Sequence, residues 1–336
     1  MDFKPAWYDS NLCGKLRYPN LLRAVQDGTD FAKQNNIAPY LKNKDPNVVL
    51  SVIDMQNDFC SPDGALYVKG AEQDVDRLCS FIYNNVGSIS NIVASLDTHY
   101  LFQPFHMKNW VAGANPSNRN SNGKRYTEGD NPEPFTLITY ADVQNDVWRP
   151  AVKIQFMHTM LKKLESTYKK NLTIWPLHCI LGAPGHAFDA NFLEAVYFHA
   201  GCRNVQYNAT TKGLSPLSEH YGILKAEVEF PEDSQTQLNV HVLDIWKNAD
   251  RIYFAGEAKS HCVLETLRQI AEVLTNEGQQ NLLQKMYIIK DCMSSVPDIH
   301  LPNGGVIEFD RMANEKFKEF EQLGFKFVDS SHKIVL

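Results

Sequence analysis

From residue 48 onward, short apolar runs alternate with amphipathic segments, and this alternation constrains the fold more than any other feature of the sequence. Val48–Ile53 is apolar except for Ser51, which is typical of a strand buried on both faces of a sheet. A turn at 61–64 and a helical pattern over residues 75–86 lead to a second apolar run at residues 92–96. Strand, helix and strand in this order predict a parallel sheet covered by helices.

The same alternation continues to the C-terminal end of the chain. Further strands are expected at residues 172–175, 205–211, 252–254, 286–289 and 325–328. Further helices are expected at residues 20–34, 151–170, 192–199, 238–246 and 309–322, and after a turn at Gly256. The sequence therefore predicts an α/β protein in which about six mostly parallel strands form one sheet.

The chain is expected to divide into an N-terminal extension, residues 1–46, and a single domain, residues 47–336. Prolines interrupt the extension, which precedes the first buried strand. Residues 115–134 are rich in Asn, Ser, Gly and Pro, which indicates a long loop. We find no internal repeat and no linker composition.

Composition excludes several classes of partner. A net charge of −6 and a pI near 6.0 argue against a nucleic-acid or anionic membrane surface. No apolar run reaches the length of a membrane span, and the N-terminus lacks a signal-peptide core. Seven scattered cysteines do not form a disulfide framework, so we expect a reducing, cytoplasmic environment.

Reactive side chains follow the predicted strands, where open parallel sheets bind their ligands. We expect five successive strands to place such groups at one rim of the sheet. These groups are Asp54, Asp97 with His99, His178, Lys212 and Cys262. A single aspartate at a strand end is more often a turn former, so the argument rests on the whole set.

The set divides by chemistry. Asp54, Lys212 and Cys262 suit covalent acyl transfer, because a carboxylate can take the thiol proton while an ammonium group lowers the thiol pKa. Cys262 is also expected in the first turn of a helix, where the dipole favours a thiolate; alternatively it is a small buried apolar residue.

Asp97, His99 and His178 offer oxygen and nitrogen ligands that suit Zn²⁺, Fe²⁺ or Mn²⁺. The alternative for Asp97 and His99 is a capped turn with a surface histidine. We expect the lysines of 151–170 to form a solvated surface, and His261 to be structural.

Six sequence blocks occur in a characteristic order: Asp54–Phe59 (DMQNDF), Leu66–Val68 (LYV), Asp97–His99 (DTH), Trp175–Gly185 (WPLHCILGAPG), Thr211–Gly213 (TKG) and Gly256–Val263 (GEAKSHCV). Together they resemble the isochorismatase-like cysteine hydrolase superfamily, and within it the nicotinamidase (pyrazinamidase) branch. The resemblance implies a three-layer α/β/α fold with a six-stranded, mostly parallel sheet.

The resemblance also implies roles for individual residues. Asp54 is then the general base, with Lys212 and Cys262 as its catalytic partners. The N–H groups of Ala258 and Cys262 form an oxyanion hole, after a cis peptide bond between Glu257 and Ala258. Substrate-binding positions are Phe59, Leu66 and Trp175. Metal-binding positions are Asp97, His99 and His178, with His106 as a candidate fourth ligand.

The implied activity is hydrolysis of nicotinamide to nicotinic acid and ammonia through a thioester, with a divalent metal, Zn²⁺ first. The partner is a small amide, with homo-oligomer formation common in the family. The chain departs from the family in its long gap between His99 and His178, which predicts an insertion at about residues 100–171, and in Ser260, where relatives often have Asp. Alternatives are an amidase for ureido, carbamoyl or larger amides, a vinyl-ether hydrolase, and a non-catalytic scaffold.

Overall fold

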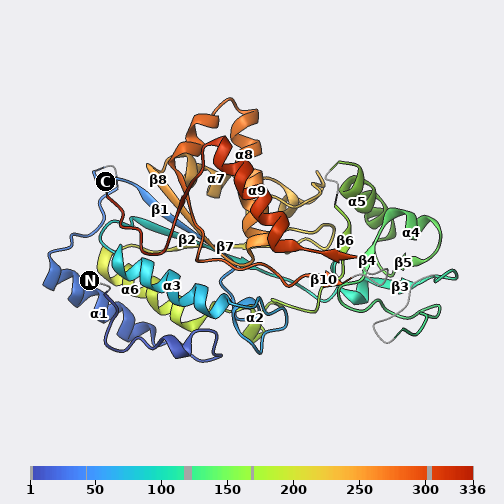
Figure 1. The fold of residues 1–336 in the computed structure, drawn as a ribbon, viewed down its shortest axis with the longest axis horizontal. Coiled ribbons are helices and arrows are strands. Elements are labelled where there is room, and N and C mark those ends of the chain that lie inside the picture. The colour runs from blue at the N-terminus through green and yellow to red at the C-terminus, as the bar shows by residue number, and fades with distance from the viewer. Residues whose placement is uncertain (1–2, 43, 117–122, 168–169, 301–304, 336) are drawn as a thin grey trace.

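The structure is a computed structural model that describes residues 3–42, 44–116, 123–167, 170–300 and 305–335 (Figure 1). Its centre is a six-stranded sheet in the order β12–β9–β8–β1–β2–β7. These strands are β1 (Val48–Ile53), β2 (Asn91–Asp97), β7 (Asn208–Lys212), β8 (Arg251–Gly256), β9 (Met286–Ile289) and β12 (Lys326–Val328). Every neighbouring pair is parallel, which confirms the predicted sheet.

Helices cover both faces of the sheet, giving the expected three layers (Figure 1). One face carries α1 (Leu21–Asn35), α3 (Ala71–Asn84) and α6 (Ala190–Arg203). The other carries α7 (Val240–Lys247), α8 (Leu264–Asn276) and α9 (Phe309–Leu323). All six residues of β1 are buried, as its apolar sequence requires between two helical layers.

The N-terminal helix α1 packs closely on α6 through a glycine from each helix. A Cβ atom added at Gly28 would lie 2.1 Å from the carbonyl oxygen of Phe198. One added at Gly201 would lie 2.2 Å from the carbonyl oxygen of Val25. Only residues without a side chain allow the two backbones to approach this closely.

The labelled elements of the insertion, which spans residues 100–171, lie together at one end of the molecule with the strand that follows it (Figure 1). Its described part contains β3 (Trp110–Ala112), β4 (Leu137–Ile138), α4 (Tyr140–Gln144), β5 (Trp148–Pro150) and α5 (Ile154–Ser166). β3 pairs with β5, and β4 pairs with β6 (Leu172–Thr173), both antiparallel. Residues 117–122 of the expected loop lie outside the described residues.

The expectation that residues 172–175 form a strand of the central sheet is wrong. Only Leu172 and Thr173 are in a strand, β6, and they pair with β4. The apolar side chains Leu172 and Ile174 are buried where this segment packs against the insertion, not in the central sheet. Reactive groups at the sheet rim therefore come from four strands, β1, β2, β7 and β8, while His178 arrives on a loop.

Short elements complete the chain: α2 (Asn57–Cys60) after β1, and β10 (Ile299–His300) paired with β11 (Val306–Ile307) before α9. No helix among the described residues is long and apolar enough to cross a bilayer.

Candidate active site

Lys212, the last residue of β7, lies at the centre of the candidate site. Its buried Nζ is 2.8 Å from Oδ2 of Asp54 and 2.9 Å from Oδ1 of Asp97. It also donates to the carbonyl of His220 at 3.1 Å and to Sγ of Cys262 at 3.6 Å. One ammonium group therefore contacts both carboxylates and the thiol.

Asp54 follows β1 directly and is held by the neighbouring strand β2. The hydroxyl of Ser95 donates to Oδ1 of Asp54 at 2.6 Å, and the backbone N–H of Asp54 donates to the same hydroxyl at 3.1 Å. A carboxylate oxygen of Asp54, one of Asp97 and Sγ of Cys262 all lie within 4.8 Å of one another. The three strand ends thus converge on one point, as their parallel order requires.

The segment between β8 and α8 presents Cys262 in this site. The peptide bond between Glu257 and Ala258 is cis, as the sequence resemblance implies. Gly256 has φ +125°, and a Cβ atom there would lie 2.0 Å from the carbonyl oxygen of Ile53 on β1, so glycine is required. Cys262 lies in a π-helical turn, Lys259–Val263, rather than in the expected first turn of an α-helix, and α8 begins at Leu264.

Burial governs the pKa values at this site. It raises the pKa of the Cys262 thiol well above its usual value, although Lys212 acts in the opposite direction. Burial also raises the pKa of Asp54. The pKa of Lys212, which burial alone would lower, is raised well above its usual value by Asp54 and Asp97. Lys212 therefore lowers the thiol pKa as expected, but desolvation is the larger effect and sets the net direction.

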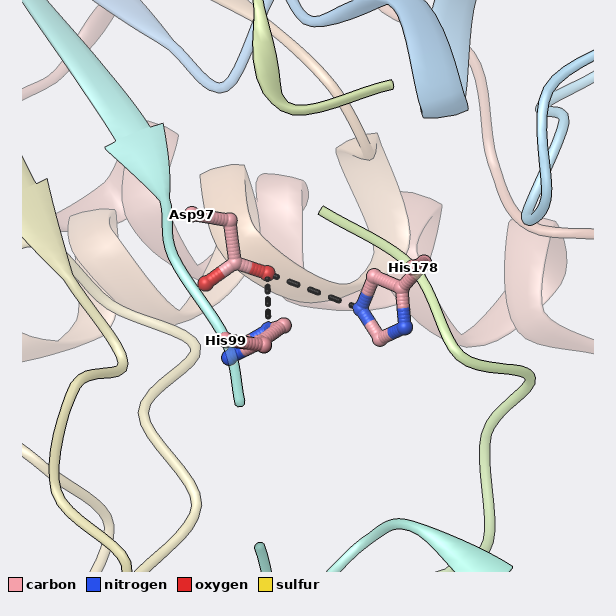
Figure 2. Close-up of side chains that lie close together, drawn as sticks. All are labelled: Asp97, His99 and His178. Atoms are coloured by element: carbon pink, nitrogen blue, oxygen red, sulfur yellow. Dashed lines mark hydrogen bonds and ion pairs between the residues drawn. The ribbon is translucent and has the colours of Figure 1, made fainter. Parts of the chain in front are cut away.

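Asp97, His99 and His178 form a second cluster (Figure 2), and Lys212 contacts its carboxylate. Oδ2 of Asp97 is 2.8 Å from Nε2 of His99 and 3.6 Å from Nε2 of His178. Burial alone would raise the pKa of Asp97, but His99 and Lys212 hold it well below its usual value. The carboxylate is therefore charged and faces two imidazole nitrogens.

Nδ1 of each of these two histidines, and of His106, faces a backbone carbonyl. Nδ1 of His99 faces the carbonyl of Gly213 at 3.3 Å. Nδ1 of His106 faces the carbonyl of Tyr100 at 2.9 Å, and Nδ1 of His178 faces that of Pro176 at 2.8 Å. A proton on Nδ1 of His106 leaves its Nε2 with a free lone pair, the form in which histidine binds metals, whereas Nε2 of His99 donates at 2.8 Å to the Asp97 carboxylate, which can only accept.

His106 is fully buried next to this cluster. Its ring centroid lies 5.7 Å from that of His99 and 5.8 Å from that of His178. Its Nε2 has no hydrogen-bond partner among the described residues. A buried nitrogen lone pair without a partner is costly, and a cation is one way to satisfy it.

A pocket of about 350 Å³, including its open mouth, lies over Cys262. Its lining residues are Phe59, Leu66, Asp97, Trp175, His178, Glu219, Tyr221, Ala258, His261, Cys262 and Val296. Phe59, Leu66 and Trp175 were expected there from the sequence. The pocket thus combines aromatic walls with the reactive groups described above.

No protein-family model matches the chain. It is 24% identical to the nicotinamidase of Saccharomyces cerevisiae over 225 residues, which are 67% of this chain and 81% of that protein. Among solved structures, it resembles the yeast nicotinamidase with a TM-score of 0.53 and 18% identity, over 84% of this chain and 99% of that one.

The likeness to a nicotinamidase/pyrazinamidase structure from Acinetobacter baumanii has a TM-score of 0.51 and 18% identity, over 86% of this chain and 99% of the other. A further yeast nicotinamidase structure, bound to the inhibitor nicotinaldehyde, matches with a TM-score of 0.52 at 17% identity, over 84% of this chain and 99% of that one. The chain has the nicotinamidase fold.

On this nicotinamidase fold, four pocket residues were not predicted as site residues: Glu219, Tyr221, His261 and Val296. His261, expected to be structural, lies against Trp175 and Tyr221, with ring centroids 5.2 and 5.4 Å away. Burial lowers its pKa to about 3, so the ring is neutral. Its position beside Cys262 was the available signal, whereas Glu219 and Tyr221 lie in a loop without periodicity.

Glu219 is the least expected member of the pocket. Its side chain is buried, and Oε1 accepts a hydrogen bond from the N–H of His220 at 3.2 Å. Oε2 has no partner among the described residues, and burial raises the pKa of this carboxyl well above its usual value. A buried carboxyl oxygen at a pocket surface is available to a ligand.

Proposed function

We propose that this protein is a metal-assisted cysteine amidohydrolase that converts nicotinamide to nicotinic acid and ammonia. The proposal rests above all on one observation: Lys212 joins Asp54, Asp97 and Cys262 at the edge of an aromatic-walled pocket. It is supported by the 24% identity with a yeast nicotinamidase. A carboxylate, an ammonium group and a thiol in contact form the arrangement that activates a nucleophile for acyl transfer.

In the first half of the reaction, Asp54 takes the proton of the Cys262 thiol as the sulfur attacks the amide carbon. The new S–C bond displaces the carbonyl π electrons onto oxygen, and the N–H groups of Ala258 and Cys262 stabilise that oxyanion. The tetrahedral centre collapses, the C–N bond breaks, and the nitrogen leaves as ammonia with the proton held by Asp54. A thioester on Cys262 remains.

In the second half, Asp54 takes a proton from water, whose oxygen attacks the thioester carbon. The C–S bond breaks, the sulfur recovers its proton from Asp54, and nicotinic acid is released. A base is needed in the first half because burial keeps the thiol protonated in the free protein, and in the second half because water loses a proton as it attacks the thioester.

Lys212 positions the general base and the nucleophile. Its ammonium contacts the general base at 2.8 Å and the sulfur at 3.6 Å, so it stabilises the thiolate as the proton leaves. Its contact with Asp97 at 2.9 Å also links this triad to the histidine cluster.

We propose that Asp97, His99 and His178 hold a divalent metal, with His106 as a fourth ligand. The donor set fits: a charged carboxylate with imidazole nitrogens of His99 and His178 beside it, and a buried Nε2 of His106 that has no partner among the described residues. Nitrogen and oxygen donors of this kind suit Zn²⁺ first, and Fe²⁺ or Mn²⁺ also. When bound, the metal supplies a Lewis acid that orients a ring nitrogen or a water.

The pocket walls favour a flat aromatic amide. Phe59, Trp175 and Tyr221 surround the space in front of Cys262, and aromatic side chains pack well on planar rings. We also propose a cytoplasmic location, because all seven cysteines are free.

Ammonia release from nicotinamide tests the proposal, with benzamide, urea derivatives and larger amides as comparison substrates. Wild-type protein should hydrolyse nicotinamide, and Cys262→Ala should lose turnover while retaining its fold and metal. Nicotinaldehyde should inhibit by accepting the Cys262 thiolate at its aldehyde carbon. Full activity of Cys262→Ala, or hydrolysis of the other amides but not nicotinamide, would contradict the proposal.

A further inference from the structure

Lys170, near the C-terminal end of the insertion, does not belong to a solvated basic surface as the sequence suggested. Its Nζ is 2.6 Å from Oε2 of Glu227 and 2.6 Å from Oε2 of Glu265, and its side chain is 31% exposed. Lys169 of the same expected surface lies outside the described residues. We call the group formed by Lys170, Glu227 and Glu265 the Lys170 cluster.

When both are ionised, the two carboxylates of the Lys170 cluster need a cation between them. The side chain of Glu227 is 0% exposed and that of Glu265 is 5% exposed, so water screens neither charge. Arg268 also contacts Glu265, through Nε at 2.7 Å. Glu227 has Lys170 as its sole ion-pair partner among the described residues. Lys170 therefore joins two segments that would otherwise repel each other.

Both segments carry parts of the candidate active site. Glu265 is the second residue of α8, which directly follows the π-helical turn that carries Cys262. The N–H of Glu227 donates to the carbonyl of Glu219 at 2.8 Å, which closes a loop that carries Glu219 and Tyr221 into the pocket.

Lys170 also lies directly behind the aromatic wall. Its Nζ is 5.8 Å from the centre of the Tyr221 ring, within the range of a cation–π contact. The Tyr221 hydroxyl accepts a hydrogen bond from Nε1 of Trp175 at 2.9 Å, and both rings pack on His261. A shift of Lys170 would therefore change the positions of three residues of the pocket wall, Tyr221, Trp175 and His261.

We propose that Lys170 is a positioning residue of the pocket. Through Lys170, the insertion holds the loop that carries Tyr221 against α8, the helix that follows Cys262. We call Tyr221, Trp175 and His261 the Tyr221 wall. This inference deepens the proposed amidohydrolase function and rests on it for its kinetic readout. Lys170 touches no reacting atom, so its loss should weaken substrate binding more than the chemical step.

Three variants and one control test the proposal. Lys170→Met removes the cation, and Lys170→Arg retains it. Lys170→Met/Glu227→Gln removes the cation together with the charge it neutralises, so this double variant keeps its fold even if Lys170→Met alone does not. Lys162→Ala, an exposed lysine on α5, is the control.

The double variant should raise KM for nicotinamide about tenfold with kcat changed less than threefold, and should be alkylated by iodoacetamide at Cys262 several-fold faster. Lys170→Arg should restore both values, and Lys162→Ala should change neither. Unchanged KM and an unchanged alkylation rate in the double variant would overturn the inference.

Alkylation of Cys262 does not depend on turnover, so the experiments can refute the proposed function and the proposed role of Lys170 independently of each other. A wild-type protein that releases no ammonia from any amide would refute the proposed function. The alkylation rates of the same four proteins would still decide whether Lys170 positions the wall over Cys262.

Discussion

For the replacement Glu227→Gln, we predict quantitatively how the unfolding free energy of the protein depends on pH. Burial, and then the charge of Glu265, raise the pKa of Glu227 from its ordinary value of 4.5 to about 7, although Lys170 opposes the shift. The folded protein therefore holds this proton more tightly than the unfolded chain does. The stabilisation is complete below pH 4.5 and is lost as pH rises through about 7.

One pKa unit corresponds to about 1.4 kcal/mol, so the wild type should lose about 3 kcal/mol of unfolding free energy from this group by pH 8.5. Glutamine cannot lose a proton and resembles the neutral acid in shape. Glu227→Gln should match the wild type near pH 5 and should be more stable near pH 8.5, by up to this amount. Urea denaturation at both pH values measures the difference.

Glu321→Gln, an exposed glutamate on α9, serves as the matched control and should give the same difference from wild type at both pH values. If the stability curves of wild type and Glu227→Gln run parallel from pH 5 to 8.5, Glu227 does not titrate in this range. The account of the Lys170 cluster as a pair of desolvated carboxylates would then be incorrect.

Three further substitutions test other parts of the structure. His106→Ala should lower metal affinity at least tenfold, as measured by competition with a chelator, and equal affinity would remove His106 from the ligand set. Gly28→Ala brings a Cβ atom to 2.1 Å from the carbonyl oxygen of Phe198 and should cost about 1–3 kcal/mol in urea denaturation, whereas Gly87→Ala, whose Cβ meets side-chain atoms no closer than 3.7 Å, should cost little. Glu219→Ala should raise KM for nicotinamide several-fold if Oε2 faces the substrate, and an unchanged KM would argue against that contact.

The central strands were predictable because their physical signal is local. β1 is apolar at five of its six positions and buried at all six, so periodicity alone identified it to the residue. The side chains at the carboxyl ends of β1, β2 and β7 were predictable because parallel strands bring these ends to one rim. Asp54, Asp97 and Lys212 meet there as expected.

Elements whose signal depends on distant parts of the chain were not predictable. Leu172 and Ile174 have the pattern of a central strand, but they are buried against the insertion, which periodicity cannot distinguish from the sheet. Lys170 fitted the helical pattern of exposed lysines, and no residue near it in the sequence indicated that Glu227 and Glu265 would be its partners.

The net pKa of the Cys262 thiol was not predictable for a related reason. Lys212 was expected to lower this pKa, and its influence does have that sign. The larger effect is burial, which depends on the packing of the whole pocket and has no signature in the sequence. Glu219 and Tyr221 were missed because loop residues enter a pocket through tertiary contacts alone.

The central claim is that Asp54, Lys212 and Cys262 act as one catalytic unit, and a double-mutant cycle on kcat/KM for nicotinamide tests it most directly. Residues that act together lose nearly all of their effect when either is removed. Asp54→Asn, Cys262→Ala and the double variant should therefore show similar losses. If the double variant instead loses the product of the two single effects, or if Cys262→Ala retains wild-type activity, the two side chains do not share a reaction step.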